Sequence, residues 1–121
     1  HFKLINDEYG HACGDQVLTH FGRLVSASIR ASDLFGRLGG EEFAVLYSST
    51  GRGDAVTQLD RLRANVADCG CPVADGELLV YTFSAGVDEY RRGETLAHLM
   101  ARADAALYAA KARGRNCVMV G

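Results

Sequence analysis

Two glycines followed by two carboxylates, Gly39-Gly40-Glu41-Glu42, form the stretch of this chain best suited to chemistry. Apolar residues flank it on both sides, so the pattern predicts a tight β-hairpin with the glycines in its turn. Glycines adopt positive φ without a steric penalty, and a ligand could lie directly on a turn that lacks side chains. Glu41 and Glu42 would place two carboxylates at the tip, where such groups bind divalent metals or act in catalysis. A solvated hairpin tip that happens to carry two acids is the competing interpretation, and this stretch alone does not decide between them.

The composition limits the classes of protein to which the chain can belong. Its 121 residues are enough for one domain with a single core, and 48% hydrophobic with 23% charged residues is typical of a soluble globular protein. A formal net charge of −2 does not favour broad binding to nucleic acid or to an anionic membrane. No apolar run approaches the length of a membrane span, and no signal peptide is evident. We therefore expect a cytoplasmic domain that contacts neither nucleic acid nor membrane.

Four cysteines, Cys13, Cys69, Cys71 and Cys117, are expected to be reduced thiols. A domain of this size needs no disulfides in the cytoplasm. One residue separates Cys69 from Cys71, which is the wrong spacing for a zinc knuckle or a thioredoxin-type motif. Isolated buried thiols are the commoner outcome for such residues.

Hydrophobic periodicity predicts a single α+β domain. Apolar residues from Val17 to Ile29 recur at spacings of three and four, which indicates one buried helical stripe, and Leu107 and Tyr108 are expected in the core of a later helix. The expected helices run from Gly14-Asp15 to about Arg30–Asp33, from Asp54 to Gly70 and from Thr95 to Gly114. The expected strands are His1–Ile5, Leu34–Leu38, Phe43–Tyr47, Pro72–Ala74, Leu78–Val87 and Asn116–Val120. This order predicts a ferredoxin-like, polymerase-palm-like βαββαβ core, with a central, mostly antiparallel sheet backed by helices.

Four blocks of motif residues extend over nearly the whole chain. They are Phe2-Lys3-Leu4-Ile5-Asn6-Asp7 with Gly10-His11 and Gly14-Asp15; Arg37-Leu38-Gly39-Gly40-Glu41-Glu42-Phe43; Phe83-Ser84-Ala85-Gly86-Val87; and Arg102-Ala103-Asp104 with Ala106-Leu107-Tyr108, Ala110-Lys111 and Gly114-Arg115-Asn116. One such block would be weak evidence, whereas four in the same order are specific. Together they resemble the GGDEF family, the diguanylate cyclases, in the GGEEF form of its signature.

The resemblance implies a metal-dependent enzyme that acts on GTP. Two GTP molecules, each held by one subunit of a homodimer, would condense to cyclic di-GMP and release two pyrophosphates, because each 3′-hydroxyl attacks the α-phosphate of the other nucleotide. Such chemistry needs Mg²⁺ (or Mn²⁺) to neutralise the triphosphate and to activate the attacking oxygen. Glu41 matches the family's metal-binding carboxylate, and Glu42 matches the adjacent acid near the metals or the 3′-hydroxyl. Gly39 and Gly40 would let the nucleotide lie across the turn.

Asn6 and Asp15 match the family's guanine-binding residues. Guanine presents N–H donors at N1 and N2, which a carboxylate accepts, and an amide can both donate and accept. Asp15 has a competing interpretation, because a carboxylate in the first turn of the predicted helix can cap free N–H groups and favour the dipole. The two roles are compatible.

Lys3, Lys111 and Arg115 match phosphate contacts of the family. The backbone N–H groups of Phe2 and Lys3 match donors to the β- and γ-phosphates. Because Lys111 and Arg115 are four residues apart at a predicted helix end, we expect them to share a face. A basic helix C-terminus that only favours the dipole is the competing interpretation.

Arg30-x-x-Asp33 stands shortly before the glycine pair, where the family carries an RxxD inhibitory site that binds the product. Arginine offers paired donors to a phosphate or to a guanine edge. An ion pair at a helix end is the competing interpretation. Arg61, on the second predicted helix, matches a secondary contact from a neighbouring domain, although an exposed helix arginine is usually only solvated.

The chain departs from the family's pattern at its start. The family carries an Asp-x-Asp-x-Phe-Lys pattern whose first aspartate is a metal ligand, and both aspartates would precede His1. We therefore expect the 121-residue chain to be an N-terminally truncated piece of a longer protein with an upstream sensor or dimerisation domain, and to be inactive or weakly active by itself. Two other functions stay open: a catalytically inactive module that binds GTP or cyclic di-GMP as a sensor, and a structural or dimerisation domain attached to a phosphodiesterase.

Overall fold

The computed structural model of the protein describes residues 11–73 and 76–121 and divides the chain into two compact units. The first unit contains the described part of His1–Ser48 together with Asp68–Tyr81, and the second contains Ser49–Ala67 together with Thr82–Gly121. Helices and short strands confirm the predicted α+β class. The first predicted strand, at residues 1–5, lies outside the described residues, and the single domain stays a prediction.

The first unit begins with helix α2, His11–Ser28. Cys13 and Val17, which are four residues apart, are both buried on it. The apolar stripe, predicted to begin at Val17, therefore begins one turn earlier, at Cys13, and the helix itself begins before the predicted start at Gly14-Asp15. The capping interpretation of Asp15 was wrong, since this residue lies beyond the first turn of the helix.

Aromatic rings join α2 to a hairpin in the first unit. The hairpin consists of β1, Leu34–Gly39, and β2, Glu42–Leu46. Phe21 on α2 meets Phe43 edge-on with a centroid distance of 5.2 Å, and Phe43 stacks on Phe35 at 5.5 Å. Such aromatic pairs contribute about 0.5–1.5 kcal/mol each beyond their burial. The predicted hairpin is confirmed, and these rings fix it against the helix.

The antiparallel register places the hairpin turn one residue later than predicted. Gly39 pairs with Glu42, so Gly40 and Glu41 form the turn. A register shift between Arg37 and Gly39 marks a β-bulge, which increases the local twist. Glu42 is consequently the first residue of β2, whereas Glu41 belongs to the turn.

The apolar run predicted as one strand, Leu78–Val87, contains two short strands. β4, Leu78–Leu79, pairs antiparallel with β3, Cys71–Pro72, in the first unit. β5, Ala85–Val87, pairs in parallel with β6, Val118–Val120, in the second unit. The described strands form three two-stranded sheets and not one central sheet. The sequence predicted one strand here because β-propensity identifies an extended run but not the strand with which each part of it pairs.

The two remaining helices end close to the predicted residues. α3, Arg52–Cys69, stops before Gly70, which has a φ of +69°. α4, Leu96–Ala112, begins after Thr95, whose hydroxyl caps the helix by accepting a backbone N–H at 3.2 Å. Gly114, with a φ of +106°, follows its C-cap. None of the described helices combines the length and the apolar character needed to cross a membrane.

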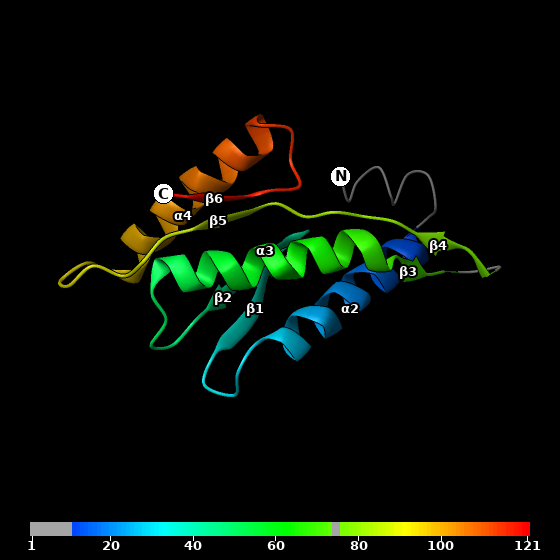
Figure 1. Ribbon diagram of the computed structural model, residues 1–121, viewed down its shortest axis with the longest axis horizontal. Helices are drawn as coiled ribbons and strands as arrows, with labels where there is room; N and C mark the ends of the chain where they lie inside the picture. Colours follow the sequence, from blue (N-terminus) through cyan, green and yellow to red (C-terminus); the bar gives the residue numbers. More distant parts are fainter. Residues whose placement is uncertain (1–10, 74–75) are drawn as a thin grey trace. The chain divides into compact units, whose positions relative to one another are not determined.

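In the second unit, α4 lies beside β5 (Figure 1). At Gly86 the two backbones approach more closely than a side chain would allow. A Cβ atom on Gly86 would lie 2.0 Å from the carbonyl oxygen of Ala103 and 2.3 Å from the amide nitrogen of Leu107. Ala106 and Ala110 are the buried residues of α4. Small residues on the strand and on the helix thus permit this contact.

The buried side of α4 is narrower than the sequence predicted. Tyr108 is 78% exposed, and Leu96 and Met100 are exposed as well. The assignment of Tyr108 to the core was wrong, because this residue is two positions from buried Ala106 and therefore about 200° around the helix. The small buried residues, and not the large apolar ones, mark the inner face.

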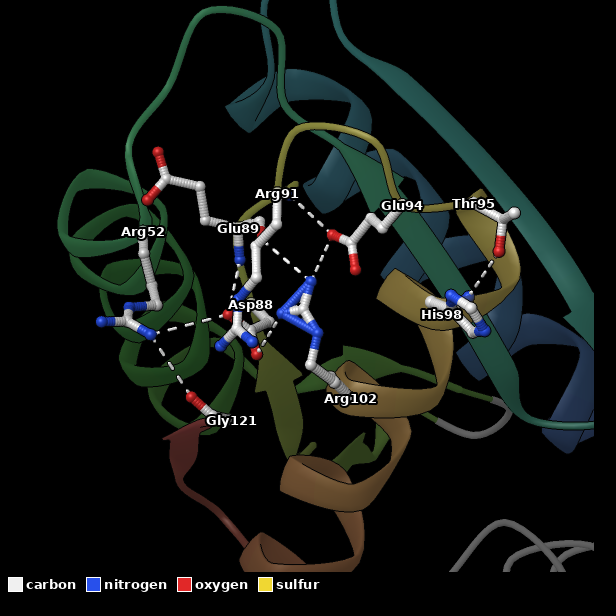
Figure 2. Close-up of polar contacts among 9 residues, drawn as sticks. All are labelled: Arg52, Asp88, Glu89, Arg91, Glu94, Thr95, His98, Arg102 and Gly121. Carbon is white, nitrogen blue, oxygen red and sulfur yellow. Dashed lines mark hydrogen bonds and ion pairs between the residues drawn. The ribbon is translucent and has the colours of Figure 1, made fainter.

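Charged side chains hold the loop between β5 and α4 (Figure 2). Arg102 Nη1 lies 3.0 Å from Asp88 Oδ2, and Arg102 Nη2 donates to the Glu94 carboxylate. The side chain of Asp88 is only 1% exposed, and Arg52 provides a second cation 3.6 Å away. The hydrogen bond from Arg102, together with one from the backbone N–H of Arg91, holds the pKa of Glu94 below its ordinary value. Because a buried carboxylate needs its partners, this cluster fixes the loop.

Candidate functional site

At the hairpin turn, the backbone of the two glycines is accessible. Gly39 and Gly40 have φ values of +152° and +50°, which residues with a Cβ rarely adopt. Chain neighbours aside, no atom of the described residues lies within 4 Å of the position that a Cβ would take on either glycine. Arg37 holds the turn, because its Nε and Nη2 donate to the Gly40 carbonyl at 2.9 and 2.5 Å. The turn therefore presents backbone on which a ligand could lie.

Glu41 and Glu42 add two exposed carboxylates to this turn. Their oxygens suit Mg²⁺ or Mn²⁺, which are hard cations. Within residues 11–73 and 76–121, no group of three or more His, Cys, Asp or Glu side chains is arranged to hold a metal. Proteins commonly hold Mg²⁺ with one or two carboxylates plus the phosphates of a substrate. The pair fits that kind of site and not a closed cage of protein ligands.

Asp15 is exposed on α2 and lies in the interior of the helix. Since it is not at the helix end, its carboxylate is not used as a cap and can accept N–H donors from a ligand. Its predicted partner in guanine binding, Asn6, lies outside the described residues, as do Phe2 and Lys3. The guanine role of Asp15 stays a prediction.

Lys111 and Arg115 lie at the end of α4 in the second unit. Lys111 is half-buried in the last helical turn, whereas Arg115 is exposed beyond the C-cap with a φ of +65°. The predicted shared helical face was therefore wrong. Asn116 follows with a φ of +50°, and its N–H donates to Ser84 Oγ at 3.0 Å, while its side-chain oxygen accepts from Arg63 Nη1 at 3.1 Å. These bonds offset the cost of the left-handed backbone, about 1–3 kcal/mol per residue.

Arg30 and Asp33 form an ion pair in the first unit, with Arg30 Nη2 3.5 Å from Asp33 Oδ1. The Asp33 side chain is fully buried, and its carboxylate accepts the backbone N–H groups of Arg30 and Ser48, both at 2.9 Å. The hydrogen bond from the Arg30 N–H, followed by that from Ser48, holds the pKa of Asp33 below its ordinary value. Arg30 also donates to the Ser48 carbonyl. The motif thus ties the loop after α2 to the residues that follow β2.

The ion pair that competed with the inhibitory-site interpretation is therefore present. The Arg30 side chain is nevertheless 55% exposed, so a ligand can reach it without unfolding the loop. Arg61 is exposed on α3, in the second unit. Binding of a product by these residues stays a prediction.

Reasoning from the sequence gave no separate role to two residues that shape the site, although Arg37 was part of the signature block. Arg37 stands three residues before Gly40, and a long donor side chain beside a glycine turn was a usable signal. Ser48 is different, because nothing in its neighbourhood marks it as a partner of Asp33 fifteen residues earlier. A hydrogen bond between residues so far apart in the sequence depends on the tertiary fold and has no local sequence signal.

Comparisons with known proteins agree with the four sequence blocks. The profile of the GGDEF family, described as "Diguanylate cyclase, GGDEF domain", matches residues 1–117. The response regulator PleD of Caulobacter vibrioides is 43% identical over 120 residues, which cover 98% of this chain and 26% of PleD. The chain thus spans about a quarter of the length of that relative.

Solved structures show the same fold. The GGDEF domain of DgcB from Caulobacter crescentus, solved in complex with c-di-GMP, matches with a TM-score of 0.94 at 36% identity, over 99% of this chain and 71% of that chain. The active GGEEF domain of a diguanylate cyclase from Vibrio cholerae matches with a TM-score of 0.87 at 35% identity, over 98% of this chain and 75% of that chain.

Proposed function

Because this chain belongs to the GGDEF family, we propose that it is a diguanylate cyclase domain, which condenses two GTP molecules into cyclic di-GMP and two pyrophosphates. The observation that carries the proposal is the open turn at Gly39 and Gly40, with two exposed carboxylates at Glu41 and Glu42. A nucleotide triphosphate needs both features, namely backbone that it can approach closely and acidic oxygens for its metal.

Each protein group at the turn has a distinct proposed role. The glycine backbone admits the nucleotide, and Arg37 keeps the turn in shape through the Gly40 carbonyl. Glu41, with Glu42 beside it, would hold Mg²⁺ or Mn²⁺ together with phosphate oxygens. When bound, the metal supplies charge neutralisation and eases deprotonation of the attacking 3′-hydroxyl. Glu42 is the carboxylate that we place nearest to that hydroxyl.

The remaining contacts are proposed from the family pattern. Asn6 and Asp15 would read the guanine edge through acceptor and donor atoms. Lys3, Lys111 and Arg115 would neutralise phosphates, with the backbone N–H groups of Phe2 and Lys3 as further donors.

Catalysis is proposed to require two copies of the domain. One hairpin turn presents one pair of carboxylates and one glycine surface, whereas the reaction joins two GTP molecules. A homodimer would supply the second site, and a sensor or dimerisation domain in the same protein would set how often the two sites meet. Cyclic di-GMP is the proposed inhibitor, bound at Arg30 and Asp33 with Arg61 from a neighbouring domain, and DgcB is a relative solved with that ligand.

The test is GTP binding and GTP turnover measured on the same samples in the presence of Mg²⁺, with a protein that also carries the two aspartates of the family pattern expected before His1. Glu42→Gln removes one negative charge and keeps the size of the side chain, so turnover is expected to fall by at least about a hundredfold while GTP binding changes little. Glu77→Gln is the matched control, because Glu77 is exposed and lies away from this turn, directly before β4. If the protein binds GTP or cyclic di-GMP but converts no GTP, either before or after the substitution, it is a sensor module and the proposal is wrong.

A further inference from the structure

Three side chains of the first unit, outside the proposed nucleotide site, form a polar chain that ends at a thiol. His20 projects from α2, Tyr81 follows β4, and Cys69 is the last residue of α3. His20 Nδ1 lies 2.8 Å from the Tyr81 hydroxyl, and His20 Nε2 lies 4.0 Å from Cys69 Sγ. The two rings also meet edge-on, with their centroids 5.8 Å apart. A base thus stands between a nucleophile and a third group that orients it, which is the arrangement of activated cysteines.

The directions of the two hydrogen bonds depend on the tautomer of His20 while the ring is neutral, and they become fixed once both ring nitrogens carry a proton. Burial raises the pKa of Tyr81, with smaller contributions from Cys71 and Cys69, so the phenol stays protonated at neutral pH. When the proton of the Cys69 thiol moves to His20 Nε2, the imidazolium can donate Nε2–H to the sulfur and Nδ1–H to the Tyr81 oxygen. Tyr81 therefore stabilises the charged imidazole as a neutral acceptor.

Accessibility singles out Cys69 among the four thiols, all of which are free. Cys69 is exposed, whereas Cys13 and Cys71 are buried and Cys117 is half-buried in the second unit. Burial also raises the pKa of the Cys71 thiol, which makes that neighbour a poorer nucleophile. Of the two thiols that lie close together at the end of α3 and in β3, Cys69 is thus the one that a reagent can reach and the one that lies beside His20.

We propose that Cys69 is a covalent modification site, a nucleophilic thiol assisted by His20 and Tyr81, which reacts with small disulfides. The Cys69 thiolate attacks one sulfur of the disulfide, a new S–S bond forms to Cys69, and the original S–S bond breaks. The departing thiolate takes the proton held by His20, so one thiol and one disulfide become one mixed disulfide and one small thiol. This inference does not depend on the proposed cyclase activity.

The experiment follows the reaction of the protein with hydroxyethyl disulfide, an uncharged small disulfide, at about pH 7. Quenched samples are digested, and mass spectrometry gives the rate at each cysteine. Cys69 is expected to be modified first, and His20→Gln is expected to slow it about tenfold, because an unassisted thiol is only a few per cent ionised at this pH. His98→Gln is the control, because His98 is exposed on α4 in the second unit, and this variant should leave the rate of Cys69 unchanged.

Tyr81→Phe provides a second variant that keeps the edge-on ring contact and removes only the hydroxyl. It should slow the reaction of Cys69 severalfold while Cys13 and Cys71 stay protected, which shows that the unit is still folded. If Cys13 and Cys71 react in His20→Gln, the first unit is unfolded in that variant, and the rate of Cys69 in Tyr81→Phe then tests the proposal. An unchanged Cys69 rate in Tyr81→Phe, or a wild-type Cys69 no faster than the same residue in the urea-unfolded chain, would overturn the proposal.

Discussion

Replacement of Gly86 by alanine tests the closest contact of the second unit. The added Cβ would lie 2.0 Å from the Ala103 carbonyl oxygen and 2.3 Å from the Leu107 amide nitrogen. Real Cβ contacts essentially never fall below 3.0 Å, so α4 must move away from β5 by at least about 1 Å. A shift of that size forfeits a quarter to a half of the dispersion energy across the contact, because attraction falls steeply with distance.

The cost can be bounded from these atoms. One extra methylene in a core costs about 1–3 kcal/mol when neighbouring side chains can adjust. The obstructing atoms here belong to the backbone of a helix and cannot rotate away, so we expect Gly86→Ala to lower the free energy of unfolding by about 3 kcal/mol or more. For a chain of this size the melting temperature should fall by roughly 10 °C.

Gly36→Ala is the matched control for that experiment. Gly36 lies in β1, and no described atom other than its chain neighbours lies within 4 Å of its Cβ position. Its replacement should change stability by less than about 0.5 kcal/mol. Urea unfolding of both variants, followed by circular dichroism, gives the comparison. If Gly86→Ala is no less stable than Gly36→Ala, the reasoning from the close contact of β5 and α4 is wrong.

Three further predictions concern charged residues. Folding lowers the pKa of Asp33 from 3.8, so its contribution to stability should be fully present above that pH and lost as the pH falls through the lower folded value. The urea midpoint should therefore fall with decreasing pH in this acidic range in wild type, and it should fall less in Asp33→Asn. Arg102→Leu should cost about 3 kcal/mol in urea unfolding, because it strips the buried Asp88 carboxylate of its nearer cation, and a loss below about 1 kcal/mol would mean that the pair behaves like an exposed one. Arg30→Ala should relieve inhibition of GTP turnover by cyclic di-GMP, and unchanged inhibition at an unchanged melting temperature would remove Arg30 from the inhibitory site.

Elements with a strong local signature could be predicted from the sequence. The hairpin followed from two glycines between apolar runs, and the ends of α4 followed from Thr95 and Gly114. The start of α2 was missed because Cys13 was not counted as part of the apolar stripe, although a buried thiol behaves as a small hydrophobic residue. Local patterns of caps, turns and periodicity therefore carried most of the fold.

Features that depend on distant partners could not be predicted in the same way. The split of the run at 78–87 depends on which strands pair with β4 and β5. The left-handed backbone at Arg115 arises from the way α4 terminates, so spacing by four did not predict a shared face with Lys111. Asp33 is bound by Ser48, fifteen residues away, and Tyr108 is exposed because the buried face of α4 is the one that carries Ala106 and Ala110. At the candidate site, the sequence predicted which residue types are present, but it did not predict their hydrogen-bond partners.

The central claim is that the hairpin turn serves a diguanylate cyclase. The most direct measurement is the product balance when a protein that includes the two aspartates expected before His1 is incubated with GTP and Mg²⁺ and the nucleotides are separated by chromatography. We expect one cyclic di-GMP and two pyrophosphates for every two GTP consumed, with no product after Glu41→Gln or after removal of the metal by a chelator. GTP converted to GDP and phosphate, or cyclic di-GMP formed equally well by Glu41→Gln, would contradict it.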